Sequence, residues 1–397
     1  MTTFKNKILT ESLADSLVNI EDKRRSNLFT WRGQFSPQLI EQLLISYGSK
    51  KSVVFDPFLG SGTVLYECGL LGLKAAGCEI NPAAVSFSKI YELINEPKEK
   101  IIVVIDSIEK KLSKLTSKLY LYTDNAAFEE DIIAEYKSCK CDIEKKVLFA
   151  LVVGMDFEVK KINIERVDSV WRTLRNNIEN LPYSTAKISC YQADCRKTPL
   201  HSNTVDLVIT SPPYINVFNY HQNYRKSVEK TGANILSVAK SEIGANRKFR
   251  QNRFLTVVQY CMDMSEVFLE LKRLCKDTAK LLFIVGRESN VRHTAYRNAD
   301  LIVSVAKLCG FTLIGQQPRT FMNKYGKLIF EEILRFSPNK DSNFDILTLD
   351  FARQVGILAL KNSLNYCDAD VVSEINDAIL KSAKIESSPL LNTTGQL

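Results

Sequence analysis

The feature that most constrains the fold is a series of short apolar runs that alternate with segments of helical periodicity. Seven runs have the length and the β-branched content of buried strands. They lie at 52–55, 75–78, 188–191, 205–209, 280–285, 311–315 and 328–336. Segments with helical spacing of apolar residues lie at 37–47, 62–71, 255–274 and 300–308. This alternation predicts an α/β fold with a doubly wound, mostly parallel seven-stranded sheet. Only a loop joins the last two runs, so these two strands can pair antiparallel.

Three segments interrupt the alternation and set the expected domain boundaries. Residues 98–185 are rich in Lys and Glu and helical in period, so we expect a helical insertion between two parts of the core, residues 1–97 and 186–338. The second part contains a polar, basic segment at 215–254, which we expect to be a loop. Residues 339–397 are predicted to form a helical extension that ends in a disordered tail.

Composition narrows the class of protein. The 397 residues are 45% hydrophobic and 25% charged, which suits one large core with an added lobe. There is no apolar run of membrane-spanning length, and the N-terminal segment contains acids, so we expect a cytoplasmic protein with no signal peptide and no membrane partner. The ten cysteines are scattered, and the nearest pair, Cys139 and Cys141, has no matching His or Cys group. We therefore expect buried free thiols and no metal site.

Residues 53–63, VVFDPFLGSGT, have the pattern of a strand, a tight glycine turn and a helix. Gly60 and Gly62 allow the backbone to approach a ligand closely, and the following helix directs its N-terminal amides at the same place. The dinucleotide fingerprint is incomplete because Leu65 occupies its third glycine position, and no phosphate-binding Gly-Lys-Ser/Thr sequence follows. The turn therefore predicts a ligand site without identifying the ligand.

Two acids follow neighbouring strands of the predicted sheet. Glu79 ends the second strand, where a carboxylate can accept hydrogen bonds from both hydroxyls of a ribose. Asp194 follows the third strand, where a carboxylate can accept from the amino group of an adenine. The alternative for each is a surface acid at a strand end.

Residues 206–214, DLVITSPPY, place a rigid Pro-Pro turn at the end of a buried strand, where α/β sheets bind ligands. An exocyclic amino nitrogen is a poor nucleophile because its lone pair is delocalised into the ring. Two acceptors that hold its hydrogens localise the lone pair, and the Ser211 side chain and the Pro212 or Pro213 carbonyl are suitable acceptors. Tyr214 can stack on a base that has left the duplex. A plain turn is the alternative.

The segments DPFLGSGT at 56–63 and TSPPY at 210–214, in this order, resemble the motifs of the amino-group DNA methyltransferases of restriction–modification type. The segment WRGQFSPQLI at 31–40 is similar to the N-terminal segment of that family, and Phe35 corresponds to its aromatic residue beside the cofactor. The resemblance covers about 28–96 and 186–337, is weak over 98–182 and is absent over 340–397.

The resemblance implies a Rossmann-like S-adenosylmethionine-dependent methyltransferase fold with a cofactor site and a catalytic turn. The implied cofactor residues are Phe35, Asp56, Phe58, Gly60, Gly62, Thr63, Glu79 and Asp194. The implied catalytic residues are Ser211, Pro212, Pro213 and Tyr214. The implied reaction is methyl transfer to an exocyclic amino group of a flipped base in double-stranded DNA. Cytosine N4 is favoured because SPPY is most often associated with it; adenine N6 and an RNA substrate remain alternatives. A restriction endonuclease that acts on the same site is a possible partner.

Basic residues gather directly after the Pro-Pro turn. Residues 221–254 hold eight basic and two acidic side chains, a surplus of +6 in a chain with a net charge of +8. Phosphate contacts supply most non-specific affinity for DNA, so this segment is a candidate DNA clamp, with a solvated loop as the alternative. The candidate contacts are Arg225, Lys226, Arg247, Lys248, Arg250 and Arg253. The insertion is the leading candidate for reading the DNA sequence, and a structural brace is the alternative.

Overall fold

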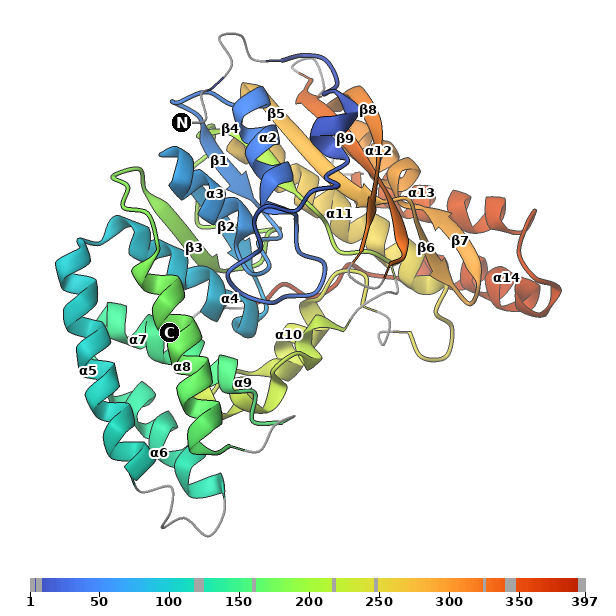
Figure 1. Ribbon diagram of the computed structural model, residues 1–397. Helices are drawn as coiled ribbons and strands as arrows, with labels where there is room; N and C mark the ends of the chain where they lie inside the picture. The colour runs from blue at the N-terminus through green and yellow to red at the C-terminus, as the bar shows by residue number, and fades with distance from the viewer. Residues whose placement is uncertain are drawn as a thin grey trace.

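The computed structural model describes residues 4, 9–117, 125–158, 162–215, 219–245, 249–323, 326–339 and 348–391. Within these residues the chain forms a seven-stranded sheet with the order β3-β2-β1-β4-β5-β9-β8 (Figure 1). The strands are β1 (Val53–Asp56), β2 (Lys74–Glu79), β3 (Ile188–Gln192), β4 (Val205–Thr210), β5 (Cys275–Gly286), β8 (Phe311–Met322) and β9 (Leu328–Pro338). The first five are parallel, and β9 pairs antiparallel with both β5 and β8. The predicted fold class is confirmed, including the antiparallel last pair.

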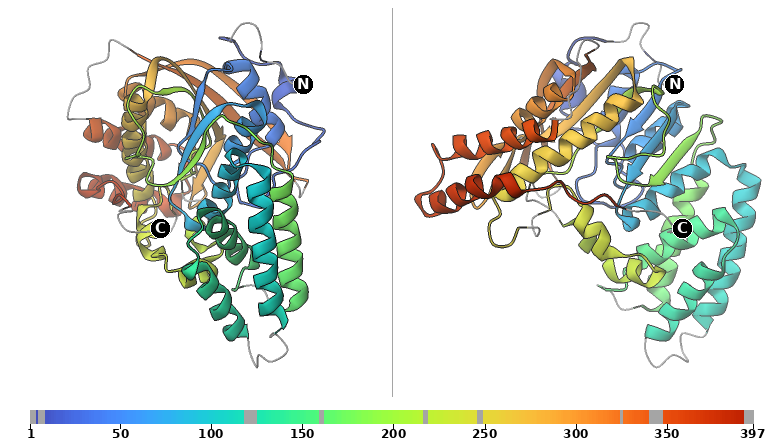
Figure 2. Two further views of the ribbon diagram at one scale, coloured as in Figure 1. Left: turned by 90° about the vertical axis from the view of Figure 1, so that its left-hand side faces the viewer. Right: turned by 180° about the vertical axis from the view of Figure 1, so that it is seen from behind.

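Helices cover both faces of the sheet because the buried strands are apolar on both sides. The helices α2 (Pro37–Tyr47), α3 (Thr63–Leu71) and α4 (Pro82–Ser88) cover one face, and α11 (Leu255–Leu274), α12 (Asn298–Leu308) and α13 (Thr348–Ser363) cover the other (Figure 2). Val54 and Leu207 belong to the core on the first side, and their chain neighbours Phe55 and Val208 to the core on the second. This alternation within each strand is what a sheet between two layers of helices requires.

The insertion between β2 and β3 contains α5 (Lys98–Ser117), α6 (Asn125–Ser138), α7 (Asp142–Met155) and α8 (Ile164–Glu179). It forms a lobe beside the β3 edge of the sheet (Figure 1). The central helix α7 buries the run Leu148–Val153 and contacts α4 of the core as well as α5, α6 and α8. The lobe is therefore joined to the core by a shared apolar interface.

Two segments differ from the sequence-based expectation. The described part of 215–254 is largely helical and not a loop, with η2 (Tyr220–Gln222), α9 (Arg225–Thr231) and α10 (Ile235–Ser241). Gly232, at a φ of +104°, ends α9, and the Asn234 side chain caps α10. The small antiparallel pair β6 (Glu288–Val291) and β7 (Thr294–Arg297) was not predicted, because its turn has Arg292 and His293 at positive φ where a turn glycine is the usual signal.

The C-terminal part was predicted to be helical, and its end disordered. Helices α13 and α14 (Val372–Lys381) lie at the far end of the molecule from the insertion (Figure 1). Residues 385–391, here called the strap, form an extended segment held against the core by hydrogen bonds from Gln259 and Arg353 to strap carbonyls. The remainder of the tail, residues 392–397, lies outside the described residues. None of the described helices is both long and apolar enough to cross a membrane.

Candidate active site

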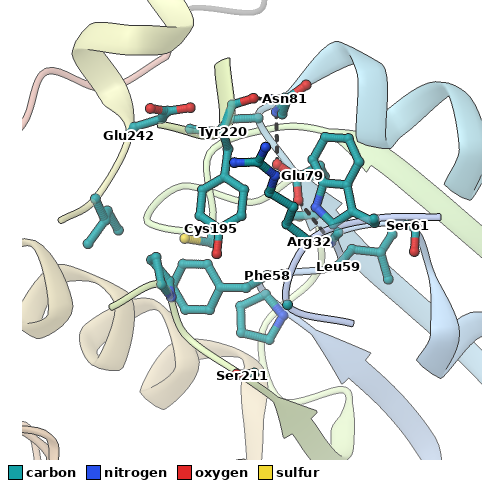
Figure 3. Close-up of a pocket in the computed structure, with 18 of the residues that line it drawn as sticks. Arg32, Phe58, Leu59, Ser61, Glu79, Asn81, Cys195, Ser211, Tyr220 and Glu242 are labelled. Carbon is teal, nitrogen blue, oxygen red and sulfur yellow. Dashed lines mark hydrogen bonds between the residues drawn. The ribbon is translucent and has the colours of Figure 1, made fainter. Parts of the chain in front are cut away.

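A cavity opens at the carboxyl edge of the sheet, beside β1 and β4. The chain returns from β3 to the middle of the sheet at this point, which is the switch point where α/β sheets bind ligands. The cavity holds about 900 Å³ of space, including its open mouth. It is lined by residues 31–35, 57–61, 63, 78–81, 193–195, 211, 213, 220 and 241–243. Figure 3 shows Glu79, Asn81 and Tyr220 on one side of it and Ser211 at the opposite end.

The glycine turn (residues 57–63) is fixed in shape by its two glycines and by hydrogen bonds. Gly60 and Gly62 have φ values of +52° and +89°, which favour glycine. A Cβ on Gly62 would lie 2.8 Å from the ring of Tyr91, so no other residue fits there. The Gly60 backbone N donates to Glu79 Oε2 at 2.8 Å, and Ser88 Oγ donates to the Gly60 carbonyl at 2.6 Å. Phe58, Gly60 and Thr63 line the cavity, whereas Gly62 shapes the turn from behind.

Glu79 lines the cavity at the end of β2, as the sequence pattern predicts. Its Oε1 accepts from the Asn81 backbone N at 2.8 Å, and its Oε2 accepts from the Gly60 backbone N. Burial raises the pKa of Glu79 to about 7, against the lowering effect of hydrogen bonds from the backbone N–H groups of Asn81, Gly60 and Ile80. The nearby carboxylate of Glu242 also raises this pKa.

Asp56 does not line the cavity, in contrast to the implied cofactor contact. It is 1% exposed, and its Oδ1 accepts from the Phe58 backbone N at 3.0 Å and from Thr210 Oγ1 at 2.6 Å. Burial raises the pKa of Asp56 to about 7. Because Thr210 immediately precedes Ser211, Asp56 joins the glycine turn to the Pro-Pro turn (residues 210–214) and is better assigned to positioning the two turns.

Asp194 lines the cavity, but its carboxylate is already occupied. It forms a buried ion pair with Arg196, with 2.7 Å between Oδ2 and Nη2. The side chains of Arg196 and Asp194 are 1% and 4% exposed. The sequence-based role for Asp194, acceptance from an adenine amino group, therefore requires an existing hydrogen bond to be exchanged.

Ser211 and Pro213 line the cavity from the end of β4, whereas Pro212 and Tyr214 do not. Tyr214 lies behind Ser211, with 3.5 Å between its hydroxyl oxygen and Ser211 Oγ. Its ring lies so close to Gly286 of β5 that a Cβ there would be 3.2 Å from ring Cζ. Burial raises the pKa of the Tyr214 phenol, which keeps it neutral. In this position Tyr214 supports Ser211, and stacking on a base would require its ring to move.

Aromatic side chains form part of the cavity wall. Phe35, Trp31 and Tyr220 are among the lining residues. The Trp31 ring stacks between Tyr220 and Tyr224, with centroid distances of 6.4 Å on both sides. The Tyr220 carbonyl accepts from Asn81 Nδ2 at 2.8 Å, which ties the segment after the Pro-Pro turn to the end of β2. The clustering of aromatics at 31–35 and 220–224 is the sequence signal for this wall.

Two further residues were missed because the segment that carries them was expected to be a loop. Glu242 lines the cavity and is 5% exposed. Its Oε1 accepts from the His221 backbone N, and its Oε2 lies 2.6 Å from His221 Nδ1. The cavity lining therefore holds the acids Glu79 and Glu242 together with the cation Arg32.

The basic residues predicted to contact DNA lie in different environments. Arg225 pairs with Glu229 on its own helix at 2.8 Å. Lys226 donates to Glu129 of the insertion at 2.9 Å, and Lys230 pairs with the other oxygen of Glu129 at the same distance. Arg250 and Arg253 are exposed. Arg247 and Lys248 lie outside the described residues. The geometry therefore assigns Lys226 to the contact with the insertion.

Comparison with known proteins gives three likenesses. Residues 3–90 match the sequence model of a family described as DNA methylase. Type II methyltransferase M.AvaI from Nostoc sp. is 24% identical over 284 residues, which cover 56% of this chain and 58% of that protein. Type II methyltransferase M.MjaII from Methanocaldococcus jannaschii is 21% identical over 403 residues, which cover 71% of this chain and 75% of that protein. The chain thus spans just under three fifths of the length of M.AvaI.

A solved structure of a SAM-dependent methyltransferase from Methanosarcina mazei covers 75% of this chain and 97% of its own. Its TM-score of 0.35 and identity of 9% are too low to bear on this chain. The parallel sheet and the glycine turn with Glu79 define an α/β protein with a cavity at the switch point of its sheet. The family match over residues 3–90 and the two Type II relatives show that the chain is similar to the amino-group DNA methyltransferase family. The cofactor of this family is S-adenosylmethionine.

Proposed function

We propose that this chain is a site-specific DNA methyltransferase that methylates an exocyclic amino group of a flipped base, with cytosine N4 as the target. The observation that carries the proposal is the meeting of the glycine turn, Glu79 and Ser211 in one cavity. Two relatives are named Type II methyltransferases, which supports DNA as the substrate and a role as the modification enzyme of a restriction–modification system. The TSPPY sequence favours cytosine over adenine, because the resemblance associates it most often with N4 methylation.

The cavity fits S-adenosylmethionine in shape and charge. The cofactor carries a net positive charge, and the acidic side chains of Glu79 and Glu242 in the cavity lining favour it. The Glu79 carboxylate at the end of β2 suits the ribose hydroxyls, and the glycine turn and Phe35, which also line the cavity, suit the methionine end. When bound, the cofactor supplies a methyl group on a sulfonium centre.

The Pro-Pro turn supplies the acceptors that the reaction needs. Ser211 Oγ and the Pro213 carbonyl project from a backbone that the two prolines hold rigid. Each acceptor takes one hydrogen of the target amino group, so the nitrogen lone pair is localised toward the methyl group. The hydroxyl of Tyr214, 3.5 Å from Ser211 Oγ, limits the rotation of the serine side chain.

DNA contacts are proposed for the exposed part of the basic segment, at Arg250 and Arg253. The lysines of α9 hold the insertion instead: besides the Glu129 contact, Lys226 Nζ donates to the Phe157 carbonyl at 3.2 Å and the Phe157 backbone N donates to Ser227 Oγ at 3.0 Å. These contacts support the brace as the role of the insertion rather than sequence reading.

The test is to incubate the protein with mixed-sequence duplex DNA and methyl-labelled cofactor, digest the DNA to nucleosides and identify the labelled one. We expect N4-methylcytosine. Labelled N6-methyladenine would replace the cytosine assignment, and transfer to RNA alone or to no nucleic acid would contradict the proposed function. Ser211→Ala should bind the cofactor but lose most of the single-turnover rate, and Ser113→Ala, on the surface of α5, is the matched control.

A further inference from the structure

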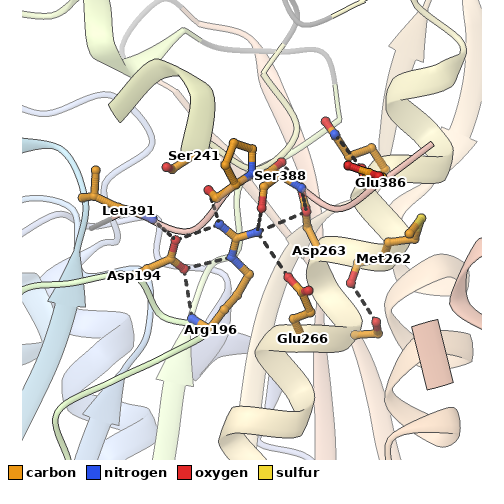
Figure 4. Close-up of polar contacts among 12 residues, drawn as sticks. Asp194, Arg196, Ser241, Met262, Asp263, Glu266, Glu386, Ser388 and Leu391 are labelled. Carbon is orange, nitrogen blue, oxygen red and sulfur yellow. Dashed lines mark hydrogen bonds and ion pairs between the residues drawn. The ribbon is translucent and has the colours of Figure 1, made fainter. Parts of the chain in front are cut away.

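The strap (residues 385–391) reaches the wall of the cavity and occupies a hydrogen-bonding position on Asp194. The Leu391 backbone N donates to Asp194 Oδ2 at 3.1 Å, and Leu391 is 8% exposed (Figure 4). The two residues are separated by 197 positions in the sequence. Asp194 itself lines the cavity between Ala193 and Cys195. Asp194 therefore binds the strap through its carboxylate and belongs to the lining of the cavity.

All acceptor positions of Asp194 are in use. Its Oδ1 accepts from the Arg196 backbone N at 3.1 Å and from Arg196 Nε at 2.9 Å. Its Oδ2 accepts from Arg196 Nη2 at 2.7 Å and from Leu391. A carboxylate has about four lone-pair positions, so a further donor must replace one of these four. The Leu391 contact is the one to exchange, because the other three come from the ion-paired Arg196, which is 1% exposed.

The rest of the strap is anchored on Asp263 and Arg196. The Ser388 backbone N donates to Asp263 Oδ1 at 2.6 Å, and the Ser388 and Pro389 carbonyls accept from the Arg196 guanidinium at 2.6 and 3.0 Å (Figure 4). Asp263 is fully buried on α11 and also pairs with Arg196. Leu391 can therefore leave Asp194 while residues 385–389 stay in place.

We propose that the Leu391 end of the strap and the adenine amino group of the cofactor compete for Asp194 Oδ2. With the strap docked, the amino group gains no new acceptor, so the protein discriminates little between ligands with and without it. When the amino group takes this position, the Leu391 amide is released to solvent. The strap thereby couples the conformation of a distant segment to occupation of the cavity. This inference rests on the proposed cofactor site.

The experiment compares two ligands on the full chain and two variants. The ligands are S-adenosylhomocysteine and its analogue with hydrogen in place of the 6-amino group, each titrated calorimetrically. Leu391→Pro removes the buried side chain and the backbone N–H, and Leu391→Ala removes the side chain alone, so it is the matched control. We expect Leu391→Pro to increase the preference for the amino-bearing ligand two- to tenfold over wild type, the value of one net hydrogen bond, and Leu391→Ala to leave the preference unchanged.

A strap that serves only to stabilise the fold would change the affinity of both ligands equally, and an unchanged preference in Leu391→Pro would overturn the proposal. A second measurement needs no variant. Hydrogen exchange at the Leu391 amide of the wild type should be faster with S-adenosylhomocysteine bound, and equal or slower exchange would also overturn it. Failure of the wild type to bind S-adenosylhomocysteine at all would instead refute the proposed cofactor site, and the competition with it.

Discussion

The hydrogen bond between Thr210 and Asp56 joins the two turns of the active site, and replacing Thr210 with Val removes it with little change in shape. Thr210 is fully buried, and its hydroxyl lies 2.6 Å from Asp56 Oδ1. A hydrogen bond to a buried carboxylate is worth about 1.5–3 kcal/mol, and one to a neutral carboxyl about 1 kcal/mol. The cost of Thr210→Val therefore depends on whether Asp56 is ionised.

The sign of the pH dependence follows from the pKa of Asp56. Burial raises it from 3.8 to about 7, and the bond from Thr210 lowers it, so Asp56 costs the folded state stability as the pH rises from about 4 to about 7. Removing the hydrogen bond raises the pKa of Asp56 further. The free energy of unfolding then falls more at a pH where Asp56 is ionised than at a pH where it is neutral. We expect Thr210→Val to reduce the free energy of unfolding by about 1 kcal/mol at pH 6 and by about 2–3 kcal/mol at pH 8.5.

Urea unfolding at both pH values measures this difference. Thr210→Ser keeps the hydroxyl and loses one methyl group, so its cost, about 1 kcal/mol, should be the same at both pH values. An equal loss in Thr210→Val at pH 6 and pH 8.5 would refute the reasoning, because it would mean that Asp56 does not change its charge in this range or that the hydroxyl does not stabilise the charged form.

Two further predictions concern ligands. The affinity for S-adenosylmethionine should rise as the pH increases through about 7, because the carboxylate of Glu79 accepts hydroxyl donors more strongly once it is ionised. In calorimetric titrations, Glu79→Gln should bind the cofactor about 1–3 kcal/mol more weakly and lose this pH dependence. A variant whose affinity depends on pH as much as that of the wild type would remove Glu79 from the site. Changing Arg250 and Arg253 to Gln should weaken binding to cognate and scrambled duplexes alike, and should reduce the salt slope of log K by roughly 0.9 for each phosphate that is no longer neutralised. The control variant Lys226→Gln should leave the salt slope unchanged and lower the thermal stability, because Lys226 pairs with Glu129. The reverse pattern would assign Lys226 to the DNA interface.

The parts of the site that could be predicted from the sequence are those set by local chemistry. The glycine turn, Glu79 at the end of β2 and Ser211 at the end of β4 each follow from residues within a few positions of one another. The edge of a parallel sheet then brings them together, whatever the chain does elsewhere. The sheet itself was predictable because buried parallel strands are continuous apolar runs.

The parts that could not be predicted depend on partners far along the chain. Nothing near Asp194 indicates that its last acceptor position is filled from residue 391, and nothing near Lys226 indicates that Glu129 neutralises it. Charge composition alone therefore does not show which basic side chains are already paired within the protein. The sequence pattern does not predict the helices in 219–245, because each is short and only a few of its residues are apolar and buried.

The position of the insertion also has a consequence for how the chain assembles. Strands β2 and β3 are neighbours in the sheet, yet the 108 residues 80–187 separate them, so an unstructured connection would make their pairing slow. Helices α5 to α8 form mostly local contacts, which can fold early and bring the two ends of this connection near each other. Substitutions in the buried run of α7 should therefore delay the addition of β3 to the sheet during refolding. The lobe therefore speeds folding by bringing β2 and β3 together early, although none of its described residues lines the cavity.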